Sequence, residues 1–193
     1  MNKIVFATNN KNKLAEVANQ LEGLFEIITL EELGSTEELE ETSDTLEGNA
    51  WQKARYIAKK YDVNCFADDT GLEIDALDGA PGVYSARYAG PQKLADDNMD
   101  LVLSNLNGES NRRAKFRTAI ALIIDNKEHL FTGEVQGVIT NEKSGAKGFG
   151  YDPIFKHEES NKTFAEFSME EKNKISHRGI AVAKLVTFLQ SSF

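Results

Sequence analysis

The chain has 193 residues, of which 40% are hydrophobic and 27% are charged, values typical of a compact globular protein with a sizeable core. A net charge of −9 argues against general binding to nucleic acid or to an anionic membrane. It does not exclude a small phosphorylated ligand that metal and a few lysines neutralise. The single cysteine, Cys65, suits a reducing compartment, and we see neither a signal peptide nor a membrane-spanning run. We therefore expect a cytoplasmic protein.

The first third of the chain alternates between strand and helix patterns. Residues 3–7 and 25–30 are short apolar runs that predict buried strands, and residues 31–44 predict an acidic loop. Between the two strands, a helix is expected from about Asn12. Its apolar face consists of Leu14, Val17, Ala18 and Leu21.

A second helix is expected after the acidic loop, with Thr45 as its N-cap. Its apolar stripe consists of Ala50, Ala54, Ile57, Ala58 and Tyr61. Strand-like runs follow at residues 64–67 and 72–77, so we expect two strands there.

The second half of the chain combines helices with a long hairpin. Residues 94–106 predict a helix that ends at Asn107-Gly108, and residues 179–190 predict a packed terminal helix. The β-rich runs at 114–124 and 129–140 predict a hairpin. Together with the helices at both ends, this hairpin predicts an α/β fold with a mixed sheet. Without repeats or linkers, we expect a single domain over the whole chain.

Two adjacent carboxylates, Asp68 and Asp69, stand at the end of an apolar run. Like charges at this spacing repel each other and do not help folding, which suggests a functional use. Mg²⁺ is the obvious candidate, because it takes oxygen ligands and keeps several waters. An acidic turn between two strands is the alternative. Residues 79–90, rich in turn-forming residues and hydroxyls with one arginine, are expected to form a wall of the same site.

A polar segment, residues 8–13, lies between the first strand and the first helix. Backbone N–H groups at a helix N-terminus form an anion site, and lysine side chains add full positive charge. The segment is not a Walker loop, since the chain lacks the G-x-x-x-x-G-K-[ST] pattern. It is either a phosphate-binding segment or a capped helix start with solvated lysines.

The loop at residues 149–152 places two aromatic residues and a carboxylate beside a glycine. Aromatic faces stack on nucleobases, and polar groups contact the base edges. Near the C-terminus Lys172, His177 and Arg178 form a cationic cluster, in which arginine can stack on a base and lysine can contact phosphate. The alternatives are a core position for Phe149 and a solvated helix start for the cluster.

Five separated segments resemble the signature motifs of the inosine triphosphate pyrophosphatases, also called XTP/dITP diphosphatases. These segments are residues 8–14, 68–72, 81–90, 149–153 and 175–178. They follow the family's order, and the resemblance runs from residue 3 to the last helix. Five motifs that match together are highly specific.

The resemblance implies a fold and a reaction. The implied fold is an elongated α/β molecule, related to Maf, with a central mixed β-sheet, flanking helices, two lobes around a substrate cleft and usually a homodimeric assembly. The implied reaction is the Mg²⁺-dependent hydrolysis of ITP, dITP and XTP to the monophosphate and pyrophosphate. Such an enzyme cleanses the nucleotide pool of deaminated, noncanonical purines.

The resemblance also implies roles for the matching residues. Asp69 would be the catalytic carboxylate and a metal ligand, Glu41 would be the second metal ligand, and Asp68 would support Asp69 in the same acidic cluster. The residues implied to bind substrate are Thr8, Asn9, Asn10, Lys11, Asn12, Lys13, Thr70, Phe149, Gly150, Tyr151, Asp152, Lys172, His177 and Arg178.

One departure from the family pattern affects the metal ligands. Many members have Glu-Asn-Ala where this chain has Gly48-Asn49-Ala50, preceded by Glu47. Both Glu41 and Glu47 are therefore candidates for the second ligand, and we favour Glu41.

The sequence leaves three other functions as alternatives. A Maf-like pyrophosphatase acting on pyrimidine nucleotides fits the motifs less well. A nucleotide sensor without turnover would gain little from adjacent acids beside a phosphate. A haloacid-dehalogenase-type phosphatase needs its second aspartate two residues after the first, whereas Asp68 and Asp69 are adjacent.

Overall fold

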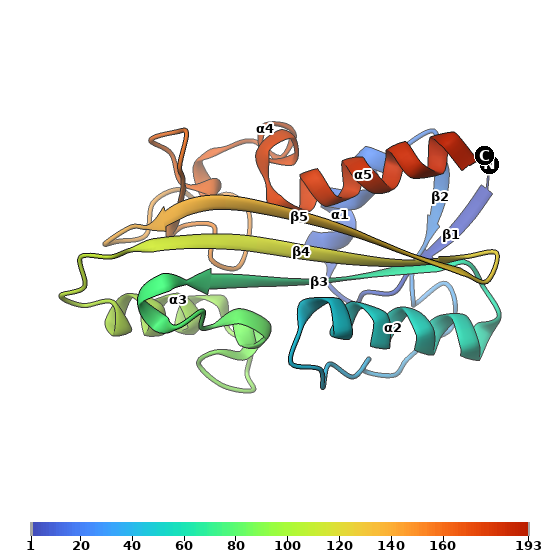
Figure 1. The fold of residues 1–193 in the computed structure, drawn as a ribbon, viewed down its shortest axis with the longest axis horizontal. Coiled ribbons are helices and arrows are strands. Elements are labelled where there is room, and N and C mark those ends of the chain that lie inside the picture. Colours follow the sequence, from blue (N-terminus) through green and yellow to red (C-terminus); the bar gives the residue numbers. More distant parts are fainter. Residues whose placement is uncertain (1, 193) are drawn as a thin grey trace. The chain divides into compact units, whose positions relative to one another are not determined.

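The computed structural model describes residues 2–192, which form a mixed β-sheet with flanking helices (Figure 1). In this part of the chain the sheet has six strands in the order β2-β1-β3-β4-β5-β6. The strands are β1 (Asn2–Phe6), β2 (Phe25–Ile28), β3 (Cys65–Ile74), β4 (Arg113–Ile124), β5 (Lys127–Ile139) and β6 (Phe155–His157). The helices are α1 (Lys11–Leu21), α2 (Leu46–Tyr61), α3 (Ala95–Asn105), α4 (Met169–Ile175) and α5 (His177–Ser192).

The predicted mixed sheet is confirmed by the strand directions. Strand β1 runs parallel to both β2 and β3, whereas β6 runs antiparallel to β5. Strands β4 and β5 are joined by a tight turn in which Asp125 and Asn126 have φ angles of 49° and 60°. Two consecutive positive φ values are typical of a type I′ hairpin turn, whose twist matches that of the strands. The long hairpin expected from the sequence is therefore present.

The chain divides into two compact units, and the first comprises the chain up to Asp69, residues 118–133 and the chain from Gly179 onward. Helix α2 lies on one face of its sheet, and α1 and α5 lie on the other (Figure 1). On the α1 and α5 side, Phe6 and Phe66 stack with ring centroids 4.4 Å apart within the apolar core. The expectation of one domain with two lobes stays a prediction.

The second unit comprises Thr70–Arg117 and Glu134–Arg178. Its core contains apolar side chains of β3, β4, β5 and α3 and includes four buried aromatic residues, Phe116, Tyr151, Phe155 and Phe164. The Phe155 ring lies 4.6 Å from the Phe116 ring and 5.0 Å from the Phe164 ring, measured between centroids. This unit therefore has its own apolar core, in which aliphatic side chains surround a group of aromatic rings.

The structure corrects four expectations from the sequence. Strand β3 is one continuous strand, not two, because its central polar residues are satisfied by other side chains. Strand β6 and helix α4 were not predicted, since elements of three and seven residues are too short to show a clear period. On α1, Ala18 is exposed while Glu16 is buried.

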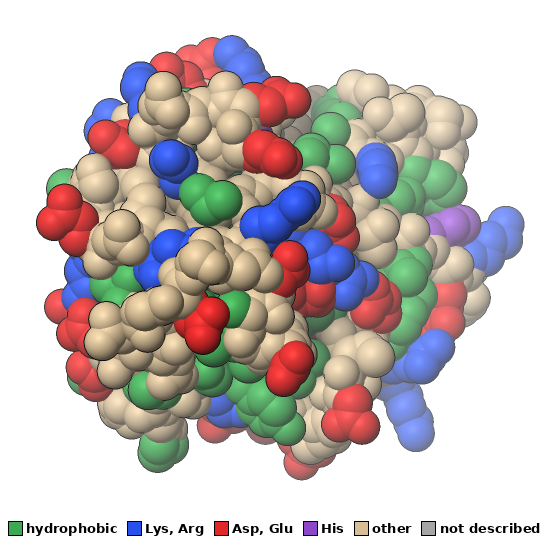
Figure 2. Space-filling model, turned by 60° about the vertical axis from the view of Figure 1, so that its left-hand side comes forward, with side chains coloured by type: hydrophobic (Ala, Val, Ile, Leu, Met, Phe, Trp, Pro, Cys, Tyr) green, Lys and Arg blue, Asp and Glu red, His purple; other side chains and the backbone are tan. Residues whose placement is uncertain are grey.

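The surface mixes charges of both signs. On the face drawn in Figure 2, acidic and basic side chains are interspersed, and hydrophobic side chains are exposed in separate small groups. Within residues 2–192, we find no helix that is both long and apolar enough to cross a membrane.

Candidate active site

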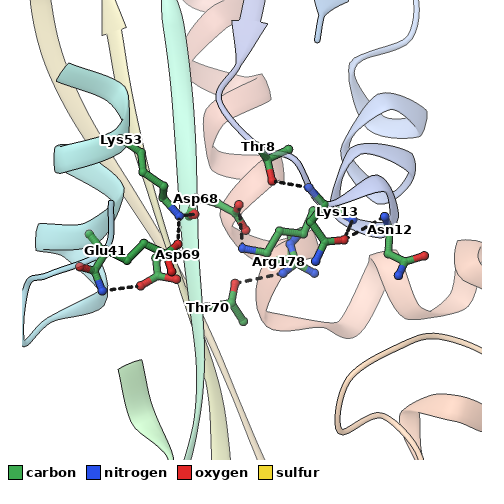
Figure 3. A network of polar contacts seen from close by, with 11 residues as sticks. Thr8, Asn12, Lys13, Glu41, Lys53, Asp68, Asp69, Thr70 and Arg178 are labelled. Carbon is green, nitrogen blue, oxygen red and sulfur yellow. Dashed lines mark hydrogen bonds and ion pairs between the residues drawn. The ribbon is translucent and has the colours of Figure 1, made fainter. Parts of the chain in front are cut away.

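The two adjacent carboxylates lie inside strand β3 and not at a turn. Asp68 is 1% exposed and Asp69 is 7% exposed. Successive side chains of a strand point to opposite faces of the sheet. Asp68 therefore contacts α1, whereas Asp69 contacts α2 (Figure 3). The two acids thus contact different helices, and a supporting role of Asp68 for Asp69 stays a prediction.

Asp68 is neutralised by lysine. Its Oδ1 atom accepts a hydrogen bond from Lys13 Nζ at 3.0 Å, and only 14% of the Lys13 side chain is exposed. The backbone carbonyl of Asp68 accepts a second hydrogen bond, from Lys53 Nζ at 2.7 Å. Figure 3 shows the two lysines approaching β3 from its two sides. This part of the strand is therefore fixed by cations from α1 and α2.

Asp69 is held by an amide and surrounded by charge. Its Oδ2 atom accepts a hydrogen bond from Asn49 Nδ2 at 3.0 Å. Burial raises the pKa of Asp69 above its ordinary value, and the negative charge of Glu41 adds to this rise. Nearby lysines, Lys53 foremost, oppose it. A carboxylate with a raised pKa is a better proton acceptor, so Asp69 is suited to act as a general base.

Lys53 is a buried cation at the centre of this group. Besides the carbonyl of Asp68, its Nζ atom contacts Glu41 Oε1 at 2.5 Å. Burial lowers the pKa of Lys53, but the carboxylates of Asp69, Glu41 and Asp68 outweigh that effect and raise its pKa overall. Lys53 therefore stays charged, and it connects the acidic loop (residues 31–44) to strand β3.

The acidic loop lies along helix α2 and is fixed to it at several points. The contacts pair Glu37 with Lys60, Glu41 with Lys53, Thr42 with Gln52 and Ser43 with Asn49. These contacts keep the Glu41 carboxylate beside β3, although the loop has no regular secondary structure.

The start of α1 uses part of its polar groups for capping. Asn10 is the N-cap, and its Oδ1 atom accepts from the backbone N–H groups of Asn12 and Lys13 at 3.0 and 3.2 Å. Thr8 Oγ1 accepts from the backbone N–H of Asn10 at 3.2 Å. The exposed residues of this segment are Asn9, Asn10, Lys11 and Asn12. The segment is thus a capped helix start that also presents amides and a lysine to solvent.

In the second unit the loop at residues 149–152 is built around a buried ion pair. Lys172 Nζ lies 2.6 Å from Asp152 Oδ2, and the two side chains are 5% and 3% exposed. The same oxygen accepts the backbone N–H of Phe149 at 2.8 Å. The Lys172 ammonium also lies 4.9 Å from the centre of the Phe149 ring, within cation–π range. A Cβ atom on Gly148 would lie 2.0 Å from Asp152 Oδ2, so this turn requires glycine.

Tyr151 anchors the loop. Only 5% of Tyr151 is exposed, and its hydroxyl donates to the backbone carbonyl of Ser85 at 2.7 Å. Burial raises the pKa of Tyr151, so the hydroxyl remains a donor. Ser85 is itself held by its side chain: its Oγ atom accepts a hydrogen bond from the backbone N–H of Leu72 and donates one to the backbone carbonyl of Gly82. Gly150, with a φ of 64°, supplies the left-handed turn.

His177 and Arg178 are buried at the start of α5 and do not form a solvated helix start. The His177 ring stacks on Phe116 with centroids 4.5 Å apart. Arg178 Nη2 donates to Thr70 Oγ1 at 3.0 Å (Figure 3). The guanidinium lies 5.5 Å from the Phe149 ring centroid. Within this unit the structure therefore brings together the predicted residues 70, 149–152, 172, 177 and 178.

Comparison with known proteins identifies the family. The sequence pattern of the Ham1 family matches residues 4–188. This chain belongs to the Ham1 family. A curated relative in Flavobacterium johnsoniae, named dITP/XTP pyrophosphatase, is 54% identical over 98% of this chain and 99% of its own length. A relative of the same name in Bacillus subtilis is 46% identical over 99% and 98% of the two chains.

Solved structures of Ham1 proteins support the same fold. The Ham1 protein of Coxiella burnetii is 40% identical, with a TM-score of 0.92 over the full length of both chains. The Ham1 protein of Staphylococcus aureus is also 40% identical, with a TM-score of 0.90 over 99% of this chain and 100% of the other. The α/β fold inferred from the motif resemblance is confirmed.

The polar group around Asp69 also fits a divalent cation. Glu41 and Asp69 are oxygen donors close enough for the charge of one to raise the pKa of the other. No three His, Cys, Asp or Glu side chains among the described residues are grouped closely enough to hold a metal by themselves. Mg²⁺ is usually bound by one or two carboxylates together with substrate phosphates, so two carboxylates suffice.

Two residues of this group, Lys53 and Asn49, were not predicted from the sequence. Lys53 contacts Glu41 and the backbone carbonyl of Asp68, and Asn49 contacts the Asp69 carboxylate. The sequence does contain a signal for these two residues. The buried stripe of α2 consists of Leu46, Asn49, Ala50, Lys53, Ala54 and Ile57. A lysine and an asparagine on an otherwise apolar helix face need buried partners, so their position in the stripe could have identified them.

Proposed function

We propose that this Ham1 protein hydrolyses noncanonical purine nucleoside triphosphates (dITP, XTP and ITP) to the monophosphate and pyrophosphate. The observation that carries the proposal is the near-full-length match to relatives named dITP/XTP pyrophosphatase. The buried, cation-flanked carboxylate of Asp69 supplies a chemical reason. The cellular role of the reaction is to cleanse the nucleotide pool.

Asp69 is the proposed general base. The oxygen of a water molecule attacks the α-phosphorus, the bond to the oxygen that bridges to the β-phosphorus breaks, and pyrophosphate leaves. The proton of the water passes to the Asp69 carboxylate. Mg²⁺, bound by Asp69 and Glu41 together with phosphate oxygens, would lower the pKa of water and neutralise phosphate charge.

The triphosphate is assigned to the residues of the first unit that carry donors and positive charge. Residues 8–13 offer exposed amides, a hydroxyl and Lys11 at the N-terminus of α1. Helix N-termini favour anions, because their N–H groups and dipole are positive. Lys172 is also proposed to contact the phosphates, as the motif resemblance implies.

The base is assigned to the loop at residues 149–152 together with Thr70, His177 and Arg178. Hypoxanthine and xanthine present a 6-keto acceptor and an N1–H donor, whereas adenine reverses this pattern. A site built for one pattern rejects the other by about 10⁴-fold, because a mismatched base leaves buried polar groups unpaired. Guanine shares the 6-keto edge, so rejection of GTP must depend on its 2-amino group.

We further propose that the protein is a cytoplasmic homodimer. Its partner is the nucleotide substrate, and not nucleic acid or a membrane, in keeping with the net charge of −9. Sedimentation of the purified protein tests the dimer directly.

A product assay tests the proposed reaction. The purified protein is incubated with dITP, XTP, ITP, GTP and ATP, with and without Mg²⁺, and the products are separated by ion exchange. We expect monophosphate and pyrophosphate from the first three nucleotides, only with Mg²⁺, and almost no turnover of GTP and ATP.

Other outcomes would contradict the proposal in different ways. Diphosphate with orthophosphate would indicate a different phosphatase mechanism. No turnover of any purine nucleotide would favour the Maf-like alternative, which a screen of pyrimidine nucleotides tests, or a sensor that binds without hydrolysis.

A further inference from the structure

Asn49 is fully buried, and both ends of its side-chain amide are used. Its relative exposure is 0%. Its Oδ1 atom accepts from the backbone N–H of Ser43 at 2.8 Å, and its Nδ2 atom donates to Asp69 Oδ2 at 3.0 Å. Asn49 therefore bridges the acidic loop and the carboxylate on β3.

Only one orientation of the Asn49 amide satisfies both hydrogen bonds. A backbone N–H can only donate, so the oxygen of the amide must face Ser43 and its nitrogen must face Asp69. Turned over, the amide would place its N–H₂ against the N–H of Ser43 and its oxygen against the carboxylate. The backbone of the acidic loop thus dictates that Asp69 receives a hydrogen-bond donor.

Gly48 allows the loop to come this close. A Cβ atom on Gly48 would lie 1.9 Å from Ser43 Oγ and 2.7 Å from Ser43 Cβ. Any other residue would therefore displace Ser43, whose backbone N–H orients the Asn49 amide. Gly48, Ser43 and Asn49 therefore act together to orient the Asn49 amide toward Asp69.

We infer that Asn49 is a positioning residue that sets the orientation of the Asp69 carboxylate for the reaction. The inference rests on the proposed function, in which Asp69 is the base. Outer partners of catalytic and metal-binding carboxylates fix their rotamers, and losing one typically costs about 10- to 100-fold in activity or metal affinity. The alternative is that Asn49 only braces the acidic loop against α2.

Two substitutions separate these roles. Asn49→Asp keeps the acceptor for the Ser43 N–H, and with it the brace, but replaces the neutral amide donor with a second acid beside Asp69. Asn49→Ala removes both. Gln52→Ala is the matched control, because this neighbouring amide fixes the same loop through Thr42 and does not contact Asp69.

We expect both Asn49 variants to lose about 10- to 100-fold in kcat toward dITP, with KM close to that of the wild type. The Gln52→Ala variant should keep the wild-type kcat. Near-normal kcat in Asn49→Asp, or equal losses in Asn49→Ala and Gln52→Ala, would overturn the inference, because bracing would then explain the effect.

A crystal structure of Asn49→Ala gives a readout that does not depend on turnover. We expect the Asp69 carboxylate to rotate while the Glu41–Lys53 contact stays in place, and an unchanged Asp69 rotamer would overturn the inference. If Asn49→Ala does not fold, the structure of Asn49→Asp decides the same question. If the wild type hydrolyses none of the nucleotides, the proposed reaction fails, and the Asp69 rotamer still decides the role of Asn49.

Discussion

In the first unit a buried carboxylate, Asp69, has a raised pKa although lysine ammonium groups lie near it, whereas in the second unit one ion pair lies beside aromatic rings. Asp69 keeps a raised pKa although Lys53 is close to it. Asp152 and Lys172 contact each other directly at 2.6 Å and are almost fully buried, with the Phe149 ring beside the ammonium. The first arrangement suits a carboxylate that accepts and releases a proton. The second suits an ion pair that stabilises the conformation of the loop around it.

The comparison shows why the two clusters respond differently to substitution. Burial disfavours the ionised form of a carboxylate whose pKa is raised. Removal of this carboxylate should therefore reduce the reaction rate more than the stability of the fold. A buried ion pair that also holds a backbone N–H is part of the fold, so loss of one partner should affect stability first. Four predictions test this difference.

The largest effect is expected for Asp69→Asn. The amide has nearly the same shape as the carboxylate but cannot accept a proton, and general-base catalysis is typically worth about 10²- to 10⁴-fold. We expect kcat toward dITP to fall by that factor with unchanged far-UV circular dichroism. Glu22→Gln, at an exposed residue after α1, is the control and should keep the wild-type rate. A near-normal rate in Asp69→Asn would remove Asp69 from its proposed role.

The second prediction concerns stability. Lys172→Met leaves the Asp152 carboxylate buried without its cation, and breaking a buried pair in this way costs about 3–5 kcal/mol. Urea denaturation should show this loss. Lys174→Met in the same helix breaks only the exposed pair with Glu170, 2.9 Å apart, and should leave stability almost unchanged, because exposed ion pairs contribute little. Equal losses in the two variants would mean that burial does not distinguish the pairs.

The third prediction sharpens the role of the aromatic ring in the second unit. Phe149→Ala should raise the KM for dITP and ITP by an amount worth about 1–3 kcal/mol of base stacking, and it should leave kcat largely unchanged. Phe149→Leu keeps apolar bulk without a π face, and it should lose nearly as much affinity. An unchanged KM in the alanine variant would argue against stacking at this ring.

The smallest effect is a dependence of stability on pH. Because the folded-state pKa of Asp69 is raised, its contribution to stability is fully present below the unfolded value of about 3.9 and is lost as the pH rises through the folded value. Asp69→Asn does not undergo this loss. In metal-free buffer, the variant should therefore gain stability over the wild type at pH 8, and this gain should shrink toward pH 4.

Urea denaturation at both pH values measures the difference. A variant that is less stable than the wild type at pH 8 would show that the hydrogen bonds and ion pairs of Asp69 outweigh its burial. Asp69 would then stabilise the fold, as the ion pair of the second unit is expected to do, and the contrast between the two units would be lost.

Periodic and strongly patterned segments were predictable from the sequence. The apolar stripes of α1 and α2, the Thr45 cap and the β4–β5 hairpin depend on local preferences, and they appear in the structure within a few residues of the predicted bounds. The short elements β6 and α4 depend on their packing partners, and the sequence did not indicate them.

The Asp68-Asp69 pair shows the limit of reading charges along the chain. Adjacent acids suggest mutual repulsion when they are read as neighbours in sequence. In strand β3 they point to opposite faces, so each finds its own partner, Lys13 for one and Asn49 for the other. A functional role for Asp68 and Asp69 remains a proposal. Mutual repulsion, the reason first given for it, does not apply in the structure, because the two side chains point to opposite faces of the sheet.

By itself, the sequence determined the longer helices, the long hairpin and the segments that resemble a family, because these depend on residue type and spacing along the chain. Only the tertiary structure decided what each polar group contacts. Lys53 lies 15 residues from the Asp68 carbonyl in sequence, and Lys13 lies 55 residues from the Asp68 carboxylate. Such partners meet because helices pack on both faces of one strand, and no local pattern encodes that meeting.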